Sequence, residues 1–127
     1  MATLGEIMTT DLLTVPPSAT VAEAATMMGQ RGTGSALVME GDALLGIFTE
    51  RDVVRALGQQ FDAAGHSVSE WMTPDPDTVP PETPLGEALR TMLQRGFRHL
   101  PVAKDGRVVG IVSIRDLSAA TDTATDR

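Results

Sequence analysis

The sequence predicts a mixed α/β fold of the α+β kind, built from two similar halves with the element order β-α-β-β-α. The first observation is an internal repeat. Shifted by 64 residues, the chain aligns with itself without a gap, and 20 of the 51 residues at positions 6–56 are identical to their counterparts. Self-similarity at a fixed spacing is typical of a repeated structural unit. The second observation is length, because halves of a 127-residue chain are too small to bury a sufficient core alone. We therefore expect two pseudo-symmetric repeats, 1–62 and 63–127, packed through their sheets.

The elements of the first half follow from periodicity and from residues that stop them. Pro16 and Pro17 end a short extended segment because proline cannot continue a strand ladder. Ser18 or Thr20 can then cap a helix, and Gly32 can end it. The predicted elements are a strand at 14–15, this helix, strands at 36–39 and 44–49 joined by a turn at 40–42, and a helix at about 51–59. Val21, Ala24, Ala25 and Met28 recur at helical spacing in the first helix, and Val53, Val54 and Leu57 share one face of the second. We expect Met27 and Met28 in the core.

The second half repeats this order. A helix with apolar residues Leu85, Ala88, Leu89 and Met92 ends near Gly96. The remaining predicted elements are a strand at 100–102, a turn at 104–106, a strand at 108–113, a shorter last helix at 115 to about 120, and a polar tail at 121–127. Residues 60–67 form a polar connector between the halves, in which we expect His66 to be exposed.

The composition excludes several classes of protein. The net charge of −7 argues against broad nucleic-acid binding, which needs a positive surface. No apolar run is long enough to span a membrane, and the first residues lack the features of a signal peptide, so a cytoplasmic location is the default expectation. The absence of cysteine excludes disulfides, thiolate metal sites and cysteine nucleophiles. No group of His, Asp and Glu has the spacing of a metal site, and no local motif indicates a catalytic triad.

One short motif occurs in both halves, at 46–52 and at 110–116. Each copy is an apolar strand that ends in a hydroxyl residue, Thr49 or Ser113, followed three residues later by Asp52 or Asp116. A hydroxyl beside the free N–H groups of a helix start can contact a phosphate, and an aspartate one turn on can accept hydrogen bonds from sugar hydroxyls. The same spacing is close to that of a helix capping box. Both interpretations stay open, and one motif can serve both roles.

In this order and spacing, the residues resemble a CBS-domain pair, a tandem module named after cystathionine β-synthase. The resemblance covers about residues 4–120. It rests on the two Gly-hydrophobic-x-Ser/Thr-x-x-Asp motifs together with the segments Ile7–Thr9, Trp71–Thr73 and Arg98–Val102 and the two Thr-Val-Pro-Pro strand ends. It implies adenosine-containing ligands in clefts between the repeats, with AMP, ADP or ATP ahead of S-adenosylmethionine and NAD, and no required cofactor. It also implies a homodimer that pairs through helices, for which the apolar faces around Val21 and Leu85 are candidates beside their use as core.

The resemblance also implies which residues contact a ligand. The motif aspartate accepts from the ribose hydroxyls, the motif hydroxyl lies near ribose or phosphate, and the start of the partner repeat holds adenine. For the cleft at Asp116, the implied residues are Thr10, Leu13, Thr14, Pro101 and Ser113. For the cleft at Asp52, they are Thr49, Asp77 and Thr78.

The two clefts differ in charge. Arg98 and His99 stand upstream of Asp116, where a basic residue in the family often contacts phosphate, and an arginine fork suits phosphate oxygens. The counterparts in the first repeat are the uncharged Gly34 and Ser35. We therefore expect the Asp116 cleft to bind a nucleotide phosphate more tightly. Arg51 and Arg115 precede the two aspartates, either as further cations of the site or as surface arginines.

The function that we expect is a non-catalytic regulatory module. It would sense adenosine-containing nucleotides and signal to a partner protein by a conformational change. One alternative is a constitutive dimerisation or scaffold module whose clefts bind nothing, and another is an enzyme acting on nucleotides, against which the absence of metal ligands and of an obvious nucleophile counts. Trp71 is expected to pack in the core rather than to stack on a ligand.

Overall fold

The computed structural model describes the backbone of residues 1–125 and the side chains of residues 1–121. The chain forms two compact units, and each is described by itself. Unit 1 consists of residues 1–11 and 77–127, and unit 2 consists of residues 12–76. This division differs from the two sequence repeats, 1–62 and 63–127, because the first segment of each repeat packs with the body of the other.

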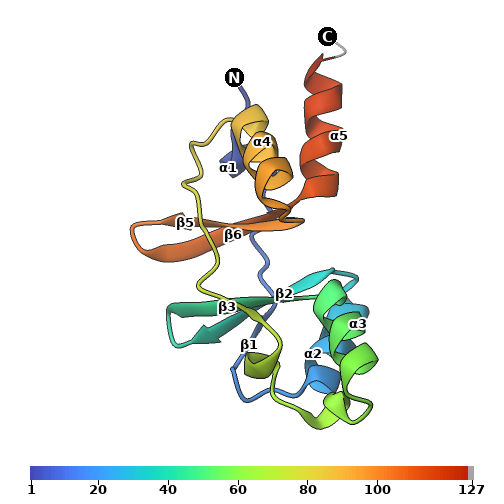
Figure 1. The fold of residues 1–127 in the computed structure, drawn as a ribbon. Helices are drawn as coiled ribbons and strands as arrows, with labels where there is room; N and C mark the ends of the chain where they lie inside the picture. The colour runs from blue at the N-terminus through green and yellow to red at the C-terminus, as the bar shows by residue number, and fades with distance from the viewer. Residues whose placement is uncertain (126–127) are drawn as a thin grey trace. The chain divides into compact units, whose positions relative to one another are not determined.

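Unit 2 holds a four-stranded sheet with the strand order β1-β2-β3-β4. Strand β1 pairs with β2 in parallel, while β2–β3 and β3–β4 are antiparallel. Helices α2 and α3 contact each other, as the lower part of Figure 1 shows. The elements are β1 (Thr14–Val15), α2 (Val21–Arg31), β2 (Ser35–Glu40), β3 (Ala43–Thr49), α3 (Glu50–Gln59), the short 3-10 helices η1 (Ala63–Gly65) and η2 (Val68–Glu70), and β4 (Thr73–Pro74).

Unit 1 repeats this plan with a shorter ladder. Strands β5 and β6 form an antiparallel hairpin, and helices α4 and α5 pack against each other beside it (Figure 1). In unit 2, the N–H of Leu37 on β2 donates to the carbonyl of Leu13. The equivalent residue of unit 1 is Pro101, which has no N–H to donate. Val79 therefore makes only an isolated parallel bridge to Val102, where unit 2 has the β1–β2 pair. The elements are α1 (Leu4–Ile7), α4 (Leu85–Arg95), β5 (His99–Lys104), β6 (Arg107–Ser113) and α5 (Ile114–Thr125).

The exchanged segments explain why the units differ from the repeats. Thr73 of β4 pairs with Ile47 of β3, and at the equivalent positions Thr9 pairs with Ile111 of β6. The approach is close in both places. A Cβ on Gly46 would meet the Sδ atom of Met72, and a Cβ on Gly110 would meet that of Met8. A glycine at this position of each copy therefore allows the segment from the other repeat to join the sheet.

Each unit has its own hydrophobic core. In unit 2, side chains of α2, β2 and β3 gather with Trp71 around the fully buried Phe48. In unit 1, α1 supplies the fully buried Leu4 to a core that also contains Leu100 and Leu117. A mixed α/β fold in two related copies is therefore confirmed.

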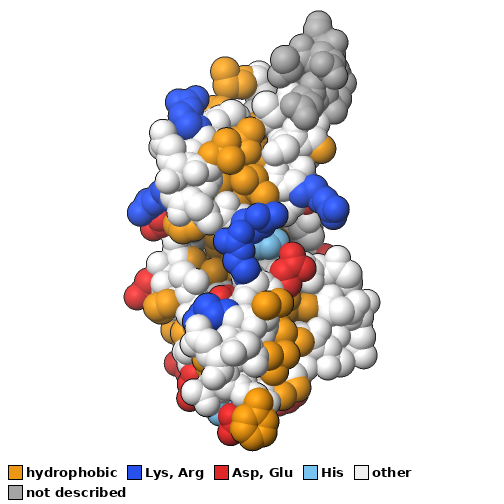
Figure 2. Space-filling view, turned by 45° about the vertical axis from the view of Figure 1, so that its right-hand side comes forward, with side chains coloured by type: hydrophobic (Ala, Val, Ile, Leu, Met, Phe, Trp, Pro, Cys, Tyr) orange, Lys and Arg blue, Asp and Glu red, His pale blue; other side chains and the backbone are white. Residues whose placement is uncertain are grey.

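The predicted helix faces need correction in part. Val21, Ala24, Met28, Leu85, Ala88 and Met92 are buried within their units, so these residues form core and are not a free surface for dimerisation. Met27 was expected in the core and is exposed on α2. Val54 and Leu57, on the predicted apolar face of α3, are exposed as well, because α3 turns Asp52 and Ala56 inward. Figure 2 shows hydrophobic side chains reaching the surface near these helices.

Two smaller expectations differ from the structure. The last helix does not end near residue 120, since α5 continues to Thr125; residues 126–127 of the expected polar tail lie outside the described residues. His66 is not fully exposed but half-buried, with its ring stacked on Trp71 at a centroid distance of 6.5 Å. The predicted stops are confirmed, since Gly32 is the left-handed C-cap of α2 with φ 66°.

Candidate functional site

The motif around Asp52 forms a complete helix cap. Thr49 is the N-cap of α3, and its backbone N–H donates to Asp52 Oδ2 at 2.9 Å. The backbone N–H of Asp52 donates back to the Thr49 hydroxyl oxygen at 3.3 Å, and this hydroxyl donates to Oδ2 at 3.1 Å. Asp52 is only 8% exposed, and these hydrogen bonds supply the partners that a buried aspartate needs. The capping role of the motif is therefore real in this copy.

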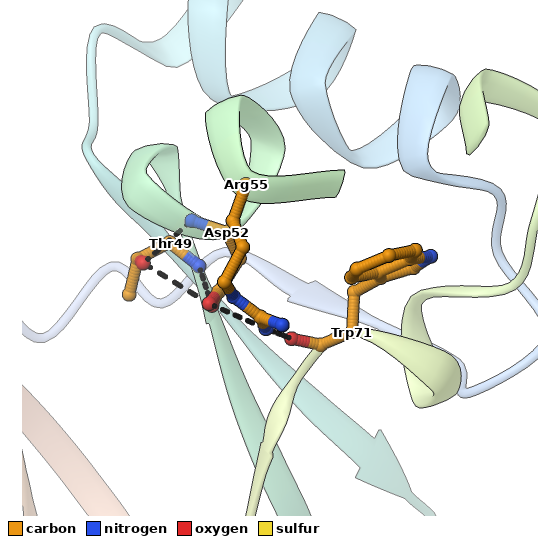
Figure 3. A network of polar contacts seen from close by, with 4 residues as sticks. All are labelled: Thr49, Asp52, Arg55 and Trp71. Carbon is orange, nitrogen blue, oxygen red and sulfur yellow. Dashed lines mark hydrogen bonds and ion pairs between the residues drawn. The ribbon is translucent and has the colours of Figure 1, made fainter. Parts of the chain in front are cut away.

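Arg55 occupies the other oxygen of the same carboxylate. Its guanidinium donates to Asp52 Oδ1 at 3.2 Å and to the Trp71 carbonyl oxygen at 2.6 Å, and Figure 3 shows these contacts in one network. The guanidinium carbon also lies 5.2 Å from the centre of the Trp71 ring, within the range of a cation–π contact. Both oxygens of Asp52 are thus engaged by groups of unit 2.

The motif around Asp116 is only half of such a cap. The backbone N–H of Asp116 donates to the Ser113 hydroxyl oxygen at 3.1 Å. Within the part of the chain that the structure describes, no hydrogen bond or ion pair engages the Asp116 carboxylate, and the residue is exposed. This carboxylate is therefore available to a ligand.

Basic residues lie at the same end of unit 1. The backbone N–H of Ile114, at the start of α5, donates to the Arg98 carbonyl oxygen at 2.9 Å. His99 faces Ser113 across the β5–β6 ladder, and Arg115 precedes Asp116 on α5. The side chains of Arg98 and Arg115 are exposed, and that of His99 is half-buried. In unit 2, the equivalent bond joins the N–H of Glu50 to the carbonyl of Gly34, which carries no charge.

The other predicted site residues are spread over both units. Thr10 is exposed and belongs to unit 1, directly after the bridge between Thr9 and Ile111. Leu13 is buried in the core of unit 2, and Thr14 is exposed on β1 of the same unit, so neither shares a unit with Asp116.

Three more predicted residues lie in unit 1. Pro101 is fully buried in β5. Asp77 forms an ion pair with Arg95, with Oδ2 and Nη1 2.7 Å apart, and Thr78 is exposed. Asp77 and Thr78 therefore do not share a unit with Asp52.

Arg55 is the residue that sequence reasoning missed. The spacing from Asp52 to Arg55 is that of neighbours on one helix face, and a pairing between them could have been read from it. The second contact could not, because the Trp71 carbonyl lies 16 residues away in the chain. Trp71 itself is buried in the core of unit 2, as predicted.

Two classes of feature are absent from the described residues. No three His, Asp or Glu side chains in residues 1–121 come together in a way that could hold a metal ion. None of the helices in the described part of the chain combines the length and apolar character needed to cross a membrane.

The chain is similar in sequence to proteins from several organisms. It is 43% identical over 124 residues to an uncharacterized 17.7 kDa protein of Acidianus ambivalens, covering 94% of this chain and 74% of that protein. It is 34% identical over 118 residues to the CBS domain-containing protein YhcV of Bacillus subtilis, covering 93% and 84%.

Solved structures show the same fold. A putative signal-transduction protein with CBS domains from Burkholderia ambifaria has a TM-score of 0.90 at 31% identity, covering 96% of this chain and 95% of that one. The CBS domain pair of MJ0100, solved with 5′-methylthioadenosine and S-adenosylmethionine, has a TM-score of 0.88 at 25% identity, with 98% of each chain covered. CBSX2, solved with AMP, has a TM-score of 0.83 at 27% identity, covering 98% and 99%.

The family model of the CBS domain matches the chain twice, at residues 4–59 and 68–122. These two matches contain both copies of the motif, the first with Asp52 and the second with Asp116. The chain therefore belongs to the CBS domain family, as a tandem pair of such domains.

Proposed function

We propose that this chain is a non-catalytic regulatory module that binds an adenosine-containing ligand beside Asp116. The observation that carries the proposal is the exposed, unengaged Asp116 carboxylate at the end of unit 1 where Arg98, His99 and Arg115 also lie. The complexes of MJ0100 and CBSX2 support this class of ligand, because both hold adenosine compounds on the same fold.

The residues of unit 1 suit the chemical parts of such a ligand. An ionised carboxylate accepts hydrogen bonds from two neighbouring ribose hydroxyls, which is the role we assign to Asp116. Arg98 and Arg115 provide donors and charge for phosphate, His99 adds a polar ring beside them, and arginine can hold two phosphate oxygens. Ser113 and Thr10 add hydroxyl groups within the same unit. The ligands that fit best are AMP, ADP and ATP, ahead of S-adenosylmethionine and NAD.

Regulation requires that a ligand favours one state over another. Binding at Asp116 would stabilise the binding-competent state of unit 1, and a partner protein that prefers this state would respond to the ligand. We further propose that the chain acts as a homodimer, as the resemblance to the family implies. The competing proposal is a scaffold without ligand, which the free carboxylate and its basic neighbours disfavour.

Isothermal titration calorimetry with AMP, ATP, S-adenosylmethionine and NAD tests the proposal. We expect binding that Asp116→Ala weakens by at least about tenfold, a free-energy loss of about 1.4 kcal/mol. Asp52→Ala should weaken it less. Glu87→Ala is the matched control, since Glu87 is an exposed acidic residue on α4 of the same unit.

The outcomes separate the candidate functions. If none of the four ligands binds, the proposal of a ligand-binding regulatory module is wrong, and a scaffold without ligand is favoured. If Asp52→Ala weakens binding more than Asp116→Ala does, the assignment to unit 1 is wrong. Incubation with ATP followed by product analysis should show no hydrolysis, and turnover would overturn the non-catalytic assignment.

A further inference from the structure

The two copies of the motif differ three residues after the aspartate. In unit 2 this position is Arg55, and in unit 1 the equivalent position, 64 residues on, is Ala119. Both positions lie on the helix that the motif begins, α3 or α5. The first copy therefore carries a cation three residues after its aspartate, and the second copy carries an alanine at that position.

Arg55 is held in place by three contacts of different kinds. It forms an ion pair with Asp52 Oδ1 at 3.2 Å, it donates to the Trp71 carbonyl at 2.6 Å, and it lies over the Trp71 ring. The other carboxylate oxygen, Oδ2, already accepts from the backbone N–H and the hydroxyl of Thr49. A ribose diol would donate two hydrogen bonds to this carboxylate, and three of its about four acceptor sites are already taken.

We propose that Arg55, by pairing with the Asp52 carboxylate, blocks ribose binding in unit 2. The chain then binds one adenosine ligand, through Asp116, and not two. This inference rests on the proposed function and deepens it, because it names the residue that decides which motif binds. A neutral hydroxyl would have to displace a charge-assisted hydrogen bond, which is stronger than a bond between neutral groups. It would also leave the Trp71 carbonyl without its donor.

The direct test removes the cation and keeps a polar side chain. We expect Arg55→Gln to bind one more equivalent of adenosine or AMP than the unchanged chain does, measured by isothermal titration calorimetry. The additional Asp52→Ala substitution should abolish this extra equivalent. Arg90→Gln is the matched control, because it removes one positive charge from an exposed position on α4 and should leave the stoichiometry unchanged. The thermal midpoint of each variant shows that it is folded.

Trp71 gives a second readout. It is the only tryptophan of the chain and lies against Arg55, so its fluorescence reports on this part of unit 2. In Arg55→Gln, the extra equivalent should change Trp71 emission, and this change should disappear in the double variant with Asp52→Ala.

The reciprocal test introduces the cation into unit 1. Ala119 is exposed on α5, so a longer side chain meets no core there. Ala119→Arg should weaken binding through Asp116 by at least about tenfold, whereas Ala119→Gln, which adds a polar side chain without charge, should change it much less. Equal effects of the two substitutions would overturn the proposal that the charge blocks the acceptor.

The outcomes distinguish this inference from the proposed function. If the unchanged chain binds through Asp116 and Arg55→Gln adds no equivalent, the role of Arg55 is wrong and the proposed function stands. If the unchanged chain binds nothing but Arg55→Gln gains binding that depends on Asp52, the role of Arg55 is supported and the assignment to Asp116 is wrong. If neither protein binds adenosine, AMP, ATP, S-adenosylmethionine or NAD, both proposals are wrong.

Discussion

Asp52 and Asp116 occupy the same position of a repeated motif but make different contacts. Asp52 accepts the Thr49 backbone N–H and pairs with Arg55, so its carboxylate is part of the structure of unit 2. Asp116 leaves the capping to the Ser113 hydroxyl, which accepts the backbone N–H of residue 116. A side chain that is not needed for folding is free to serve a ligand, so the difference in hydrogen bonding is also a difference in available chemistry.

This difference predicts unequal costs of removing the two carboxylates. Asp52→Ala should lower the free energy of unfolding by about 1–2 kcal/mol, because it removes one half of the capping box and leaves the part-buried Thr49 N–H without its acceptor. Asp116→Ala should cost less than about 1 kcal/mol, the effect of one charge near a helix N-terminus. Urea unfolding of both variants without ligand measures the two losses. A loss for Asp116→Ala as large as that for Asp52→Ala would contradict the structural assignment.

At the scale of elements, the exchanged segments make specific demands on two glycines. A Cβ at Gly46 would lie 2.8 Å from the Thr73 carbonyl oxygen, which is backbone, besides meeting the Met72 side chain. The three atoms nearest to a Cβ at Gly110 all belong to the side chain of Met8, which can adopt another rotamer. We therefore expect Gly46→Ala to cost about 1–3 kcal/mol of stability and Gly110→Ala to cost less. Thermal unfolding of the two variants checks the order, and the reverse order would contradict it.

The N-terminal helix should stabilise unit 1 and not the rest of its own repeat. Leu4 is 0% exposed in the core of unit 1, and its backbone N–H donates to the Thr83 carbonyl. Leu4→Ala should cost about 2–5 kcal/mol, as expected for a large side chain removed from a core. Hydrogen exchange followed by mass spectrometry should show lost protection in α4, β5 and β6. If protection is lost first in α2, β2 and β3, the division into units is wrong.

How far the sequence predicts these elements depends on how local the cause is. The repeat, the cap at Thr49 and the stop at Gly32 follow from neighbouring residues, and the structure confirms them. The exchange of the first segments is not local, because a repeat pattern does not say which copy a leading strand joins. The inward turn of Asp52, which leaves Val54 and Leu57 exposed, depends on Arg55 and the distant Trp71 carbonyl.

At the scale of the whole molecule, apolar side chains are exposed on and just after α3. Val54 is 73% exposed and Leu57 is 47% exposed on this helix, and Phe61, just beyond it, is 97% exposed. Val54 and Leu57 are three residues apart and share one face of α3. Neighbouring exposed apolar side chains of this kind mark interaction surfaces more often than isolated ones do. A second copy of the chain is the partner that the proposed homodimer provides.

This proposal predicts that a charge on α3 separates the copies. Val54→Glu should turn a homodimer into a monomer in size-exclusion chromatography with light scattering, because an unpaired carboxylate buried in an apolar interface is costly. The fold should be unaffected, since substitutions at exposed positions usually change stability by less than about 0.5 kcal/mol. Gln59→Glu adds the same charge at another exposed position of α3 and is the control. A dimer that survives Val54→Glu would show that copies pair through another surface, and an unchanged chain that is monomeric at all concentrations would show that the homodimer itself is wrong.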